Sequence, residues 1–297
     1  MRLFADDCFL YRSINSPVDC QNIQKDLDAF TKWEKDWQMS FNVDKCHTSY
    51  FSTKKSNLDT TYVLNNHVLT KVHHHSYLGV ILSEDLKWSE HIVYLTSSTK
   101  QTLGITGRNF RNVSVDCKSK LYHSLVRPKI EYANSAWYSY LQKDIHHPDM
   151  IQRSAARLCF KNYSKEPGEV TDMLNKLEWP SFEGRRILYW LSMFHWIVYP
   201  TVDIDKDMYL TPFPRTSRSG SSKTFIRPHS NCNQYAFSFF PWSVNQWNRH
   251  PGNIVNIDDN LKFTLHTYIT YIYIYIYIYI YLLLMFIYYL FIILLYF

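Results

Sequence analysis

The sequence predicts an α+β fold, in which a small sheet with one helix is followed by a mostly helical region. Residues 18–38 carry apolar side chains at spacings of three and four, as one face of a helix does. Residues 56–95 are mostly extended, with alternating apolar positions separated by turn residues. Residues 96–199 contain further stretches with helical apolar spacing.

The first element is a predicted hairpin around Phe4-Ala5-Asp6-Asp7, since apolar residues flank the acidic pair on both sides. Adjacent carboxylates repel each other, and a divalent cation such as Mg²⁺ removes that cost because it prefers hard oxygen ligands. The alternative is a solvated Asp-Asp turn, for which aspartate is also well suited. The tetrapeptide alone leaves both interpretations open.

The helix over residues 18–38 is expected to begin near Pro17, because proline is favoured in a first helical turn. Its apolar face consists of Ile23, Leu27, Phe30, Trp33 and Trp37. The apolar residues alternate again over residues 39–46, which predicts a strand.

The extended stretch contains Asn65-Asn66, which predicts a turn between two short strands. It also contains His73-His74-His75, a run that suggests a metal site. Neighbouring residues of a strand point to opposite faces, so the three imidazoles do not easily share one metal. We therefore favour a polar strand edge over a metal site.

The helical region carries scattered arginines, whose forked guanidinium groups suit phosphate contacts. The alternative is a solvated helix face, which scattered charges also fit. The candidates for nucleic-acid binding are Arg108, Arg111, Arg127, Arg153 and Arg157. Helix breaks are expected at Pro128, Pro148, Pro167 and Pro180.

The last 34 residues, 264–297, differ from the rest, with unbroken Tyr-Ile alternation over residues 271–281 and no charged residue after Lys262. A (TA)n repeat read as TAT and ATA codons gives such a peptide, so we expect translated genomic sequence here. The alternative is a membrane anchor formed by residues 268–297, because long apolar runs predict spanning helices.

The formal charge of +6 and the isoelectric point near 8.8 are compatible with nucleic-acid binding without indicating it by themselves. The six cysteines include no Cys-x2-Cys pair, so no zinc ribbon is indicated, and reduced thiols are expected. The expected location is the nucleus or cytoplasm, or a membrane if the apolar tail inserts.

In order and spacing, these segments resemble the reverse transcriptases of LINE-type (non-LTR, jockey-like) retrotransposons. Phe4-Ala5-Asp6-Asp7 is similar to their palm motif, and residues 27–46 are similar to the helix and strand that follow it. Residues 77–92 resemble the primer-grip hairpin, residues 122–157 the helical thumb, and residues 242–263 the C-terminal ending.

The resemblance divides the chain into five parts. We expect a partial palm over residues 1–95, a thumb-like helical region over residues 96–199, and a Pro/Ser-rich linker over residues 200–230. An aromatic C-terminal module over residues 231–263 and the low-complexity tail over residues 264–297 follow.

For the chemistry, the resemblance implies RNA-directed DNA polymerisation with Mg²⁺, an RNA template and a DNA primer. Asp6 matches the metal-binding carboxylate and Asp7 its less direct companion. Lys45 matches a lysine that is proposed to protonate the leaving pyrophosphate. The segment Leu78-Gly79-Val80 matches the primer-grip turn, where glycine lets the backbone approach the primer terminus.

The chain also departs from the family pattern. The first palm carboxylate of such enzymes lies well upstream of the motif that matches Asp6, as do the fingers. We therefore expect a fragment that is inactive alone, since two-metal catalysis needs carboxylates from two motifs. The alternative is a non-enzymatic remnant that binds nucleic acid or is anchored in a membrane.

Overall fold

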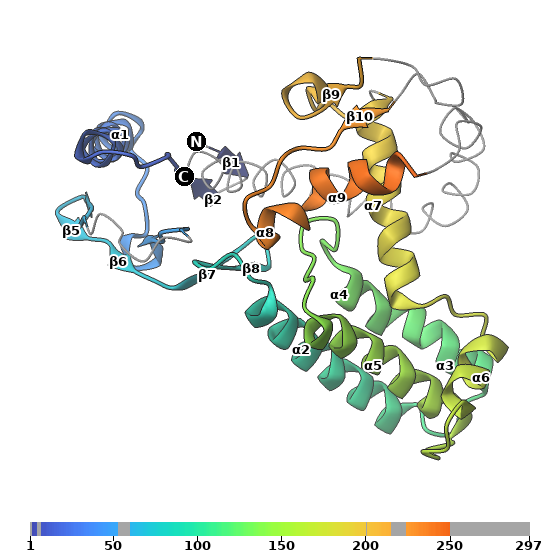
Figure 1. The fold of residues 1–297 in the computed structure, drawn as a ribbon. Coiled ribbons are helices and arrows are strands. Elements are labelled where there is room, and N and C mark those ends of the chain that lie inside the picture. The colour runs from blue at the N-terminus through green and yellow to red at the C-terminus, as the bar shows by residue number, and fades with distance from the viewer. Residues whose placement is uncertain (1, 5–6, 53–59, 200, 215–223, 250–297) are drawn as a thin grey trace. The chain divides into compact units, whose positions relative to one another are not determined.

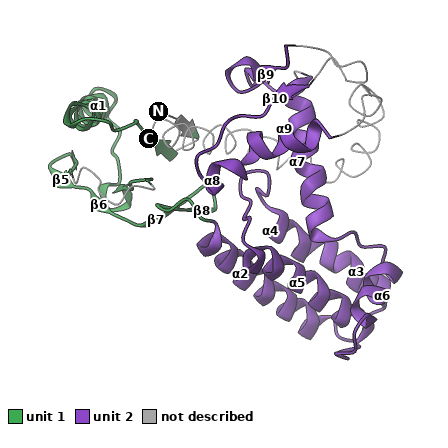
Figure 2. Ribbon diagram, viewed as in Figure 1, with its two compact units in different colours: residues 1–87, 282–297 green, residues 88–281 purple. Residues whose placement is uncertain are grey.

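The computed structural model (Figure 1) describes the chain except for residues 1, 5–6, 53–59, 200, 215–223 and 250–297. The described residues fall into two compact units, one within Met1–Lys87 and the other within Trp88–Tyr281 (Figure 2). The boundary lies ahead of the predicted one after residue 95, because the helix that begins at Ser89 belongs to the second unit.

The first unit contains one long helix and several two-stranded ladders. The hairpins β1–β2, β4–β5 and β7–β8 are antiparallel, whereas β3 and β6 pair in parallel. In chain order, the elements are β1 (Arg2–Phe4), β2 (Asp7–Phe9), α1 (Pro17–Trp37), the 3-10 helix η1 (Val43–Lys45), β3 (His47–Thr48), β4 (Val63–Leu64), β5 (His67–Val68), β6 (Thr70–Lys71), β7 (His74–Tyr77) and β8 (Val80–Ser83).

Helix α1 has the bounds that its apolar period predicts. The carboxylate of Asp19 accepts hydrogen bonds from the backbone N–H groups of Asn15 and Ser16, which satisfies donors at the start of the helix. Its buried residues pack against the following strands in a core of Cys20, Leu27, Tyr62, Leu64 and Leu69. The predicted helix over residues 18–38 is thus confirmed.

Two polar side chains of α1 also hold the β4–β5 hairpin. The amide of Gln24 donates to the carbonyl oxygen of Val63 at 2.8 Å and accepts from its N–H at 3.0 Å. The buried carboxylate of Glu34 accepts from the side-chain amide of Asn65. Asn65 and Asn66 have φ angles of 50° and 63°, which confirms the predicted turn.

The strand predicted over residues 39–46 is wrong. These residues form a coil followed by η1, and pairing begins only at His47. The backbone groups find partners locally, since the N–H of Phe41 donates to the carboxylate of Glu34 at 2.7 Å and that of Lys45 to the carbonyl of Asn42. Because these bonds satisfy the backbone, apolar alternation does not lead to a ladder here.

The second unit is helical, with one short hairpin. Its elements are α2 (Ser89–Asn109), α3 (Val115–Leu121), the π-helical turn η2 (Tyr122–Val126), α4 (Arg127–Glu131), α5 (Gln142–Phe160), α6 (Glu169–Lys176), α7 (Phe182–Val198), the 3-10 helix η3 (Lys206–Met208), β9 (Thr211–Pro212), β10 (Phe225–Ile226), α8 (Asn233–Ala236) and α9 (Phe239–Trp247).

Helices α2 and α5 lie side by side and run in the same direction (Figure 1). Near their first turns, the hydroxyl of Ser89 donates to the carboxylate of Asp144 at 2.8 Å. Near their last turns, Gly107 lies so close to Leu158 that an added Cβ would be 2.5 Å from its Cδ1. The missing side chain therefore allows the helices to approach closely.

Two predicted helix breaks do not occur. Pro128 lies in the first turn of α4, and the π-helical turn before it widens the backbone where the ring needs room. Pro148 lies inside α5 and has no N–H to donate within the helix. Side chains hold the first turn of α5, since the carboxylate of Asp144 accepts hydrogen bonds from the hydroxyls of Ser89 and Ser139.

Part of the predicted linker over residues 200–230 is packed rather than extended. Strand β9 pairs with β10, and the side chains of Val202, Ile204, Tyr209, Leu210 and Phe225 are buried. The aromatic module beyond it packs on α7, where Trp190 contacts Trp242 edge-on at 5.2 Å between ring centroids. Within the described residues, no helix is both long and apolar enough to cross a bilayer, and the tail over residues 268–297 lies outside them.

Candidate functional site

The β1–β2 hairpin carries Asp7 at the start of its second strand. Phe4 pairs with Asp7 and Leu3 with Cys8, so residues 5–6 connect the strands. Asp7 is exposed as the first residue of β2, while Asp6 lies outside the described residues. The predicted hairpin therefore forms, whereas the position of Asp6 within it stays a prediction.

The β7–β8 hairpin has an equally tight turn at Leu78-Gly79, closed by the pair Tyr77 and Val80. The φ angles are 47° at Leu78 and 74° at Gly79, the left-handed pair that a type I′ turn requires. Glycine adopts this conformation without steric cost, whereas leucine does not. Val80 is fully buried and anchors the turn to the unit.

The two hairpins are in contact. The ring of Phe9 on β2 lies 5.4 Å from the ring of Tyr77 on β7. Residues two apart on a strand share a face, so Asp7 and His75 lie on the faces that meet. Burial raises the pKa of Tyr77, and the negative charge of Asp7 raises it further. The structure thus brings Asp7 close to the strand that leads into the Leu78-Gly79 turn.

The segment that contains Lys45 lies beside the same strand. The imidazole of His47, two residues after Lys45, is 5.6 Å from that of His75. Burial lowers the pKa of His75, the neighbouring His47 lowers it further, and Asp7 opposes this effect. Lys45 is exposed at the end of η1. Asp7, Lys45 and the β7–β8 turn therefore come from elements that gather in one part of the first unit.

The carboxylate oxygens of Asp7 suit a hard cation such as Mg²⁺. Among the residues that the structure describes, no three His, Cys, Asp or Glu side chains are grouped to hold a metal ion. Of the histidine run, His73 is paired with Glu84 at 2.9 Å, whereas His75 faces His47.

The structure gives the five candidate arginines different surroundings. Arg108 and Arg111 are exposed near the end of α2, and Arg157 is half-buried on α5. Arg153 is paired with Asp149 at 2.8 Å. Arg127 is only 8% exposed and belongs to a buried cluster, so the described structure gives it a structural role.

That cluster has one carboxylate, Glu131, between two arginines. The Nε of Arg127 donates to Glu131 at 3.0 Å, and Arg185 donates to its other oxygen. The hydroxyl of Tyr189 donates to the same carboxylate at 3.1 Å, and Arg185 also donates to Gln152 at 2.9 Å. The cluster joins α4, α5 and α7. The i,i+4 spacing of Arg127 and Glu131 is visible in the sequence, whereas the contributions of Arg185, Tyr189 and Gln152 depend on the fold.

The exposed side of α2 is a basic surface that the sequence analysis only partly identified. No acidic residue occurs from position 91 to 115, whereas Lys100, Arg108 and Arg111 are exposed there. Lys129 of α4 reaches the same helix and donates to the hydroxyl of Thr102 at 2.9 Å. Lys100 and Lys129 were missed, although the acid-free run itself is visible in the sequence.

Comparison with known proteins gives relatives of one kind. The chain is 32% identical over 136 residues to the RNA-directed DNA polymerase from mobile element jockey of Drosophila funebris, covering 44% of the chain and 14% of that relative. Its counterpart from Drosophila melanogaster is 27% identical over 135 residues, covering 43% and 14%. A probable RNA-directed DNA polymerase from transposon X-element of Drosophila melanogaster is 25% identical over 161 residues, covering 52% and 17%.

No protein-family model and no solved structure matches the chain. The matched segment spans 14% to 17% of the length of these curated relatives. Over about half of its own length, the chain is thus similar to jockey and X-element RNA-directed DNA polymerases, as its resemblance to LINE-type reverse transcriptases predicted.

Proposed function

We propose that this chain forms part of the RNA-directed DNA polymerase of a non-LTR retrotransposon. It contributes a catalytic hairpin, a primer-contacting turn and a helical surface for nucleic acid. The observation that carries the proposal is the contact between the β1–β2 and β7–β8 hairpins through Phe9 and Tyr77. The similarity to jockey polymerases supports it.

Each element has a role in this proposal. Asp6 and Asp7 would hold Mg²⁺, and the bound ion would supply Lewis-acid chemistry for phosphoryl transfer. Lys45 supplies a proton to the leaving pyrophosphate, for which its exposed position on η1 is suitable. The Leu78-Gly79 turn contacts the primer terminus through its backbone, because Gly79 has no side chain to prevent a close approach.

The proposed partners are an RNA template and a DNA primer. The phosphates of the duplex contact the basic surface of α2, where Lys100, Arg108, Arg111 and Lys129 offer cations without a neighbouring acidic residue on that helix. Nearby hydroxyls such as that of Ser97 add phosphate contacts that fix the register. The enzyme then acts in the nucleus or the cytoplasm.

The binding proposal is tested by titrating the full chain with a labelled RNA–DNA hybrid at several salt concentrations. Each lost phosphate contact lowers the slope of log K against log salt by about 1, so Arg108→Gln/Arg111→Gln lowers it by about 2. The matched control is Lys143→Gln/Lys206→Gln, which removes the same charge; Lys143 lies at the opposite end of α5 from Leu158. Equal slopes for both double variants would refute the assignment of this surface.

We further propose that these 297 residues do not extend a primer by themselves. Two-metal catalysis needs carboxylates from two motifs. The resemblance assigns one of these motifs to this chain, at Asp6 and Asp7. Primer extension on poly(rA)/oligo(dT) with Mg²⁺ or Mn²⁺ tests this. Incorporation above background that is lost in Asp6→Asn would overturn it.

A non-enzymatic nucleic-acid-binding protein is the second candidate, because the basic surface of α2 favours binding whether or not catalysis occurs. The two functions differ in the hairpin. A binding protein tolerates Asp6→Asn and Asp7→Asn in every assay, whereas a polymerase part does not once the remaining catalytic elements are supplied.

A further inference from the structure

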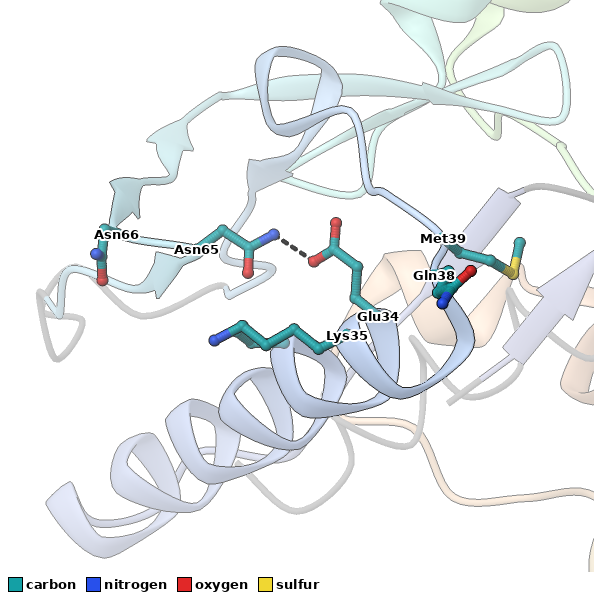
Figure 3. Close-up of a pocket in the computed structure, with 7 residues that line it drawn as sticks. Glu34, Lys35, Gln38, Met39, Asn65 and Asn66 are labelled. Atoms are coloured by element: carbon teal, nitrogen blue, oxygen red, sulfur yellow. Dashed lines mark hydrogen bonds between the residues drawn. The ribbon is translucent and has the colours of Figure 1, made fainter.

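A polar groove in the first unit lies outside the proposed catalytic elements. It is a hollow of about 500 Å³ between the last turns of α1 and the β4–β5 turn (Figure 3). Its lining residues are Thr31, Glu34, Lys35, Gln38, Met39, Asn65 and Asn66.

The carboxylate of Glu34 organises this groove. It is 8% exposed, and its two oxygens accept hydrogen bonds from the N–H of Phe41 and the side-chain amide of Asn65. The amide of Asn65 is therefore fixed, as the dashed line in Figure 3 shows. Since Phe41 precedes η1, the same carboxylate links the groove to the segment that contains Lys45.

Three other groups remain available to a ligand. Within the described residues, the side chains of Lys35, Gln38 and Asn66 form no hydrogen bond with the protein, and they lie around the groove (Figure 3). The backbone at Gln38 and Asn66 has φ angles of 51° and 63°. These amides are therefore carried on turns of fixed geometry rather than on freely rotating loops.

Exposed aromatic side chains occur on the same turns of α1. Trp33 is 41% exposed and Trp37 is 67% exposed, with ring centroids 6.5 Å apart. Trp33 also contacts Phe41 at 6.0 Å, which steadies the inner indole. The indole of Trp37, which precedes the groove residue Gln38 in the chain, is thus the more exposed of the two.

We propose that this groove binds an unpaired base of a single-stranded nucleic acid, with a neighbouring base stacked on Trp37. Amides offer a donor and an acceptor together, as the edge of a base does, and stacking on aromatic rings is the usual support for unpaired bases. Lys35 contacts a phosphate of the same strand. The buried charge of Glu34 disfavours a free anion, whereas a base carries donors that this carboxylate attracts.

The proposal rests on the nucleic-acid function proposed above and adds a second, single-strand site to it. The probes are fluorescein-labelled homopolymers of about 12 nucleotides, a length within the usual site size, titrated against the full chain by anisotropy. Trp37→Ala removes the stacking face at an exposed position. Asn66→Gly removes the amide but keeps a residue suited to a positive φ. The matched control is Tyr163→Ala, since Tyr163 is also 67% exposed but lies in the second unit.

Trp37→Ala should weaken single-strand binding about tenfold, within the range for loss of one stacked base. Asn66→Gly should reduce the differences in affinity among the four homopolymers, and Tyr163→Ala should change neither property. Binding within twofold of the wild-type protein in both groove variants would overturn the inference. Failure of the proposal for the α2 surface would show separately, because Arg108→Gln/Arg111→Gln would then leave binding of the hybrid duplex unchanged.

Discussion

Neutralising Glu131 tests how the second unit is held together. The substitution Glu131→Gln keeps the size of the side chain but removes the negative charge between Arg127 and Arg185. All three side chains are between 5% and 9% exposed, so water has little access to solvate the two guanidinium groups after Glu131 is neutralised. Burial alone lowers the pKa of Arg127, yet Glu131 and Tyr189 raise it above the usual value, so the ion pair outweighs desolvation.

The expected loss of stability is large because the guanidinium groups of Arg127 and Arg185 are left without a counter-ion. Removing one partner of a buried ion pair destabilises a protein by about 3–5 kcal/mol. The amide oxygen of the new glutamine still accepts one hydrogen bond, which keeps the expected value within this range rather than above it. By contrast, Arg127→Met leaves Glu131 paired with Arg185 and should cost less.

Chemical denaturation of the full chain, followed by tryptophan fluorescence, measures the loss. The matched control is Asp116→Asn, which breaks the i,i+4 pair between Asp116 and Lys120, whose side chains are 73% and 77% exposed. This control should leave the unfolding midpoint unchanged, because exposed pairs contribute little. Equal midpoints for Glu131→Gln and Asp116→Asn would refute the assignment of Glu131 as the shared counter-ion.

The remaining predictions concern pH and helix packing. Burial lowers the pKa of His91 to about 4, so the unfolded chain binds the proton more readily between pH 6.5 and 4. The contribution of His91 to the free energy of unfolding is therefore fully present above pH 6.5 and falls by up to about 3 kcal/mol towards pH 4. Denaturation measured across this pH range should show a smaller fall for His91→Gln. Gly104→Ala should stabilise α2 by about 0.5–1 kcal/mol, because an added Cβ makes only ordinary contacts there. Gly107→Ala should give no such gain, since Leu158 must move to make room for the added Cβ. Thermal melts of both variants test this, and an equal gain in stability would contradict the close packing of α2 and α5.

Local patterns predicted the elements that depend on neighbours in sequence. The helix over residues 18–38 follows from its apolar period, and the break expected at Pro180 precedes the start of α7 at Phe182. The Asn65-Asn66 turn follows from the tolerance of asparagine for positive φ.

Elements that depend on distant partners were not predictable. Residues 39–46 alternate like a strand, yet the carboxylate of Glu34 takes the N–H of Phe41 and a 3-10 helix follows. The break expected at Pro148 fails because Asp144 holds the first turn of α5 through its side chain. In both cases hydrogen bonds to side-chain carboxylates outweigh the local preference.

The same distinction applies to the candidate site. The carboxylates at Asp6 and Asp7 and the turn at Gly79 were assigned from sequence motifs. The proximity of Asp7 to the strand before this turn depends on the contact between Phe9 and Tyr77, which are far apart in the chain, and no local pattern indicates it. Arg127 could not be separated from Arg108 by residue type, because only packing shows that one guanidinium is buried beside Glu131 and the other is exposed.

The central claim is that the hairpin carrying Asp6 and Asp7 belongs to a polymerase site. The most direct test replaces the matching segment of a jockey RNA-directed DNA polymerase with the corresponding residues of this chain and measures primer extension on an RNA template. The account predicts incorporation by the chimera, loss of incorporation to background in Asp6→Asn, and no loss in Asp36→Asn, a matched exposed carboxylate on α1. A chimera that extends primers at an unchanged rate after Asp6→Asn would contradict it.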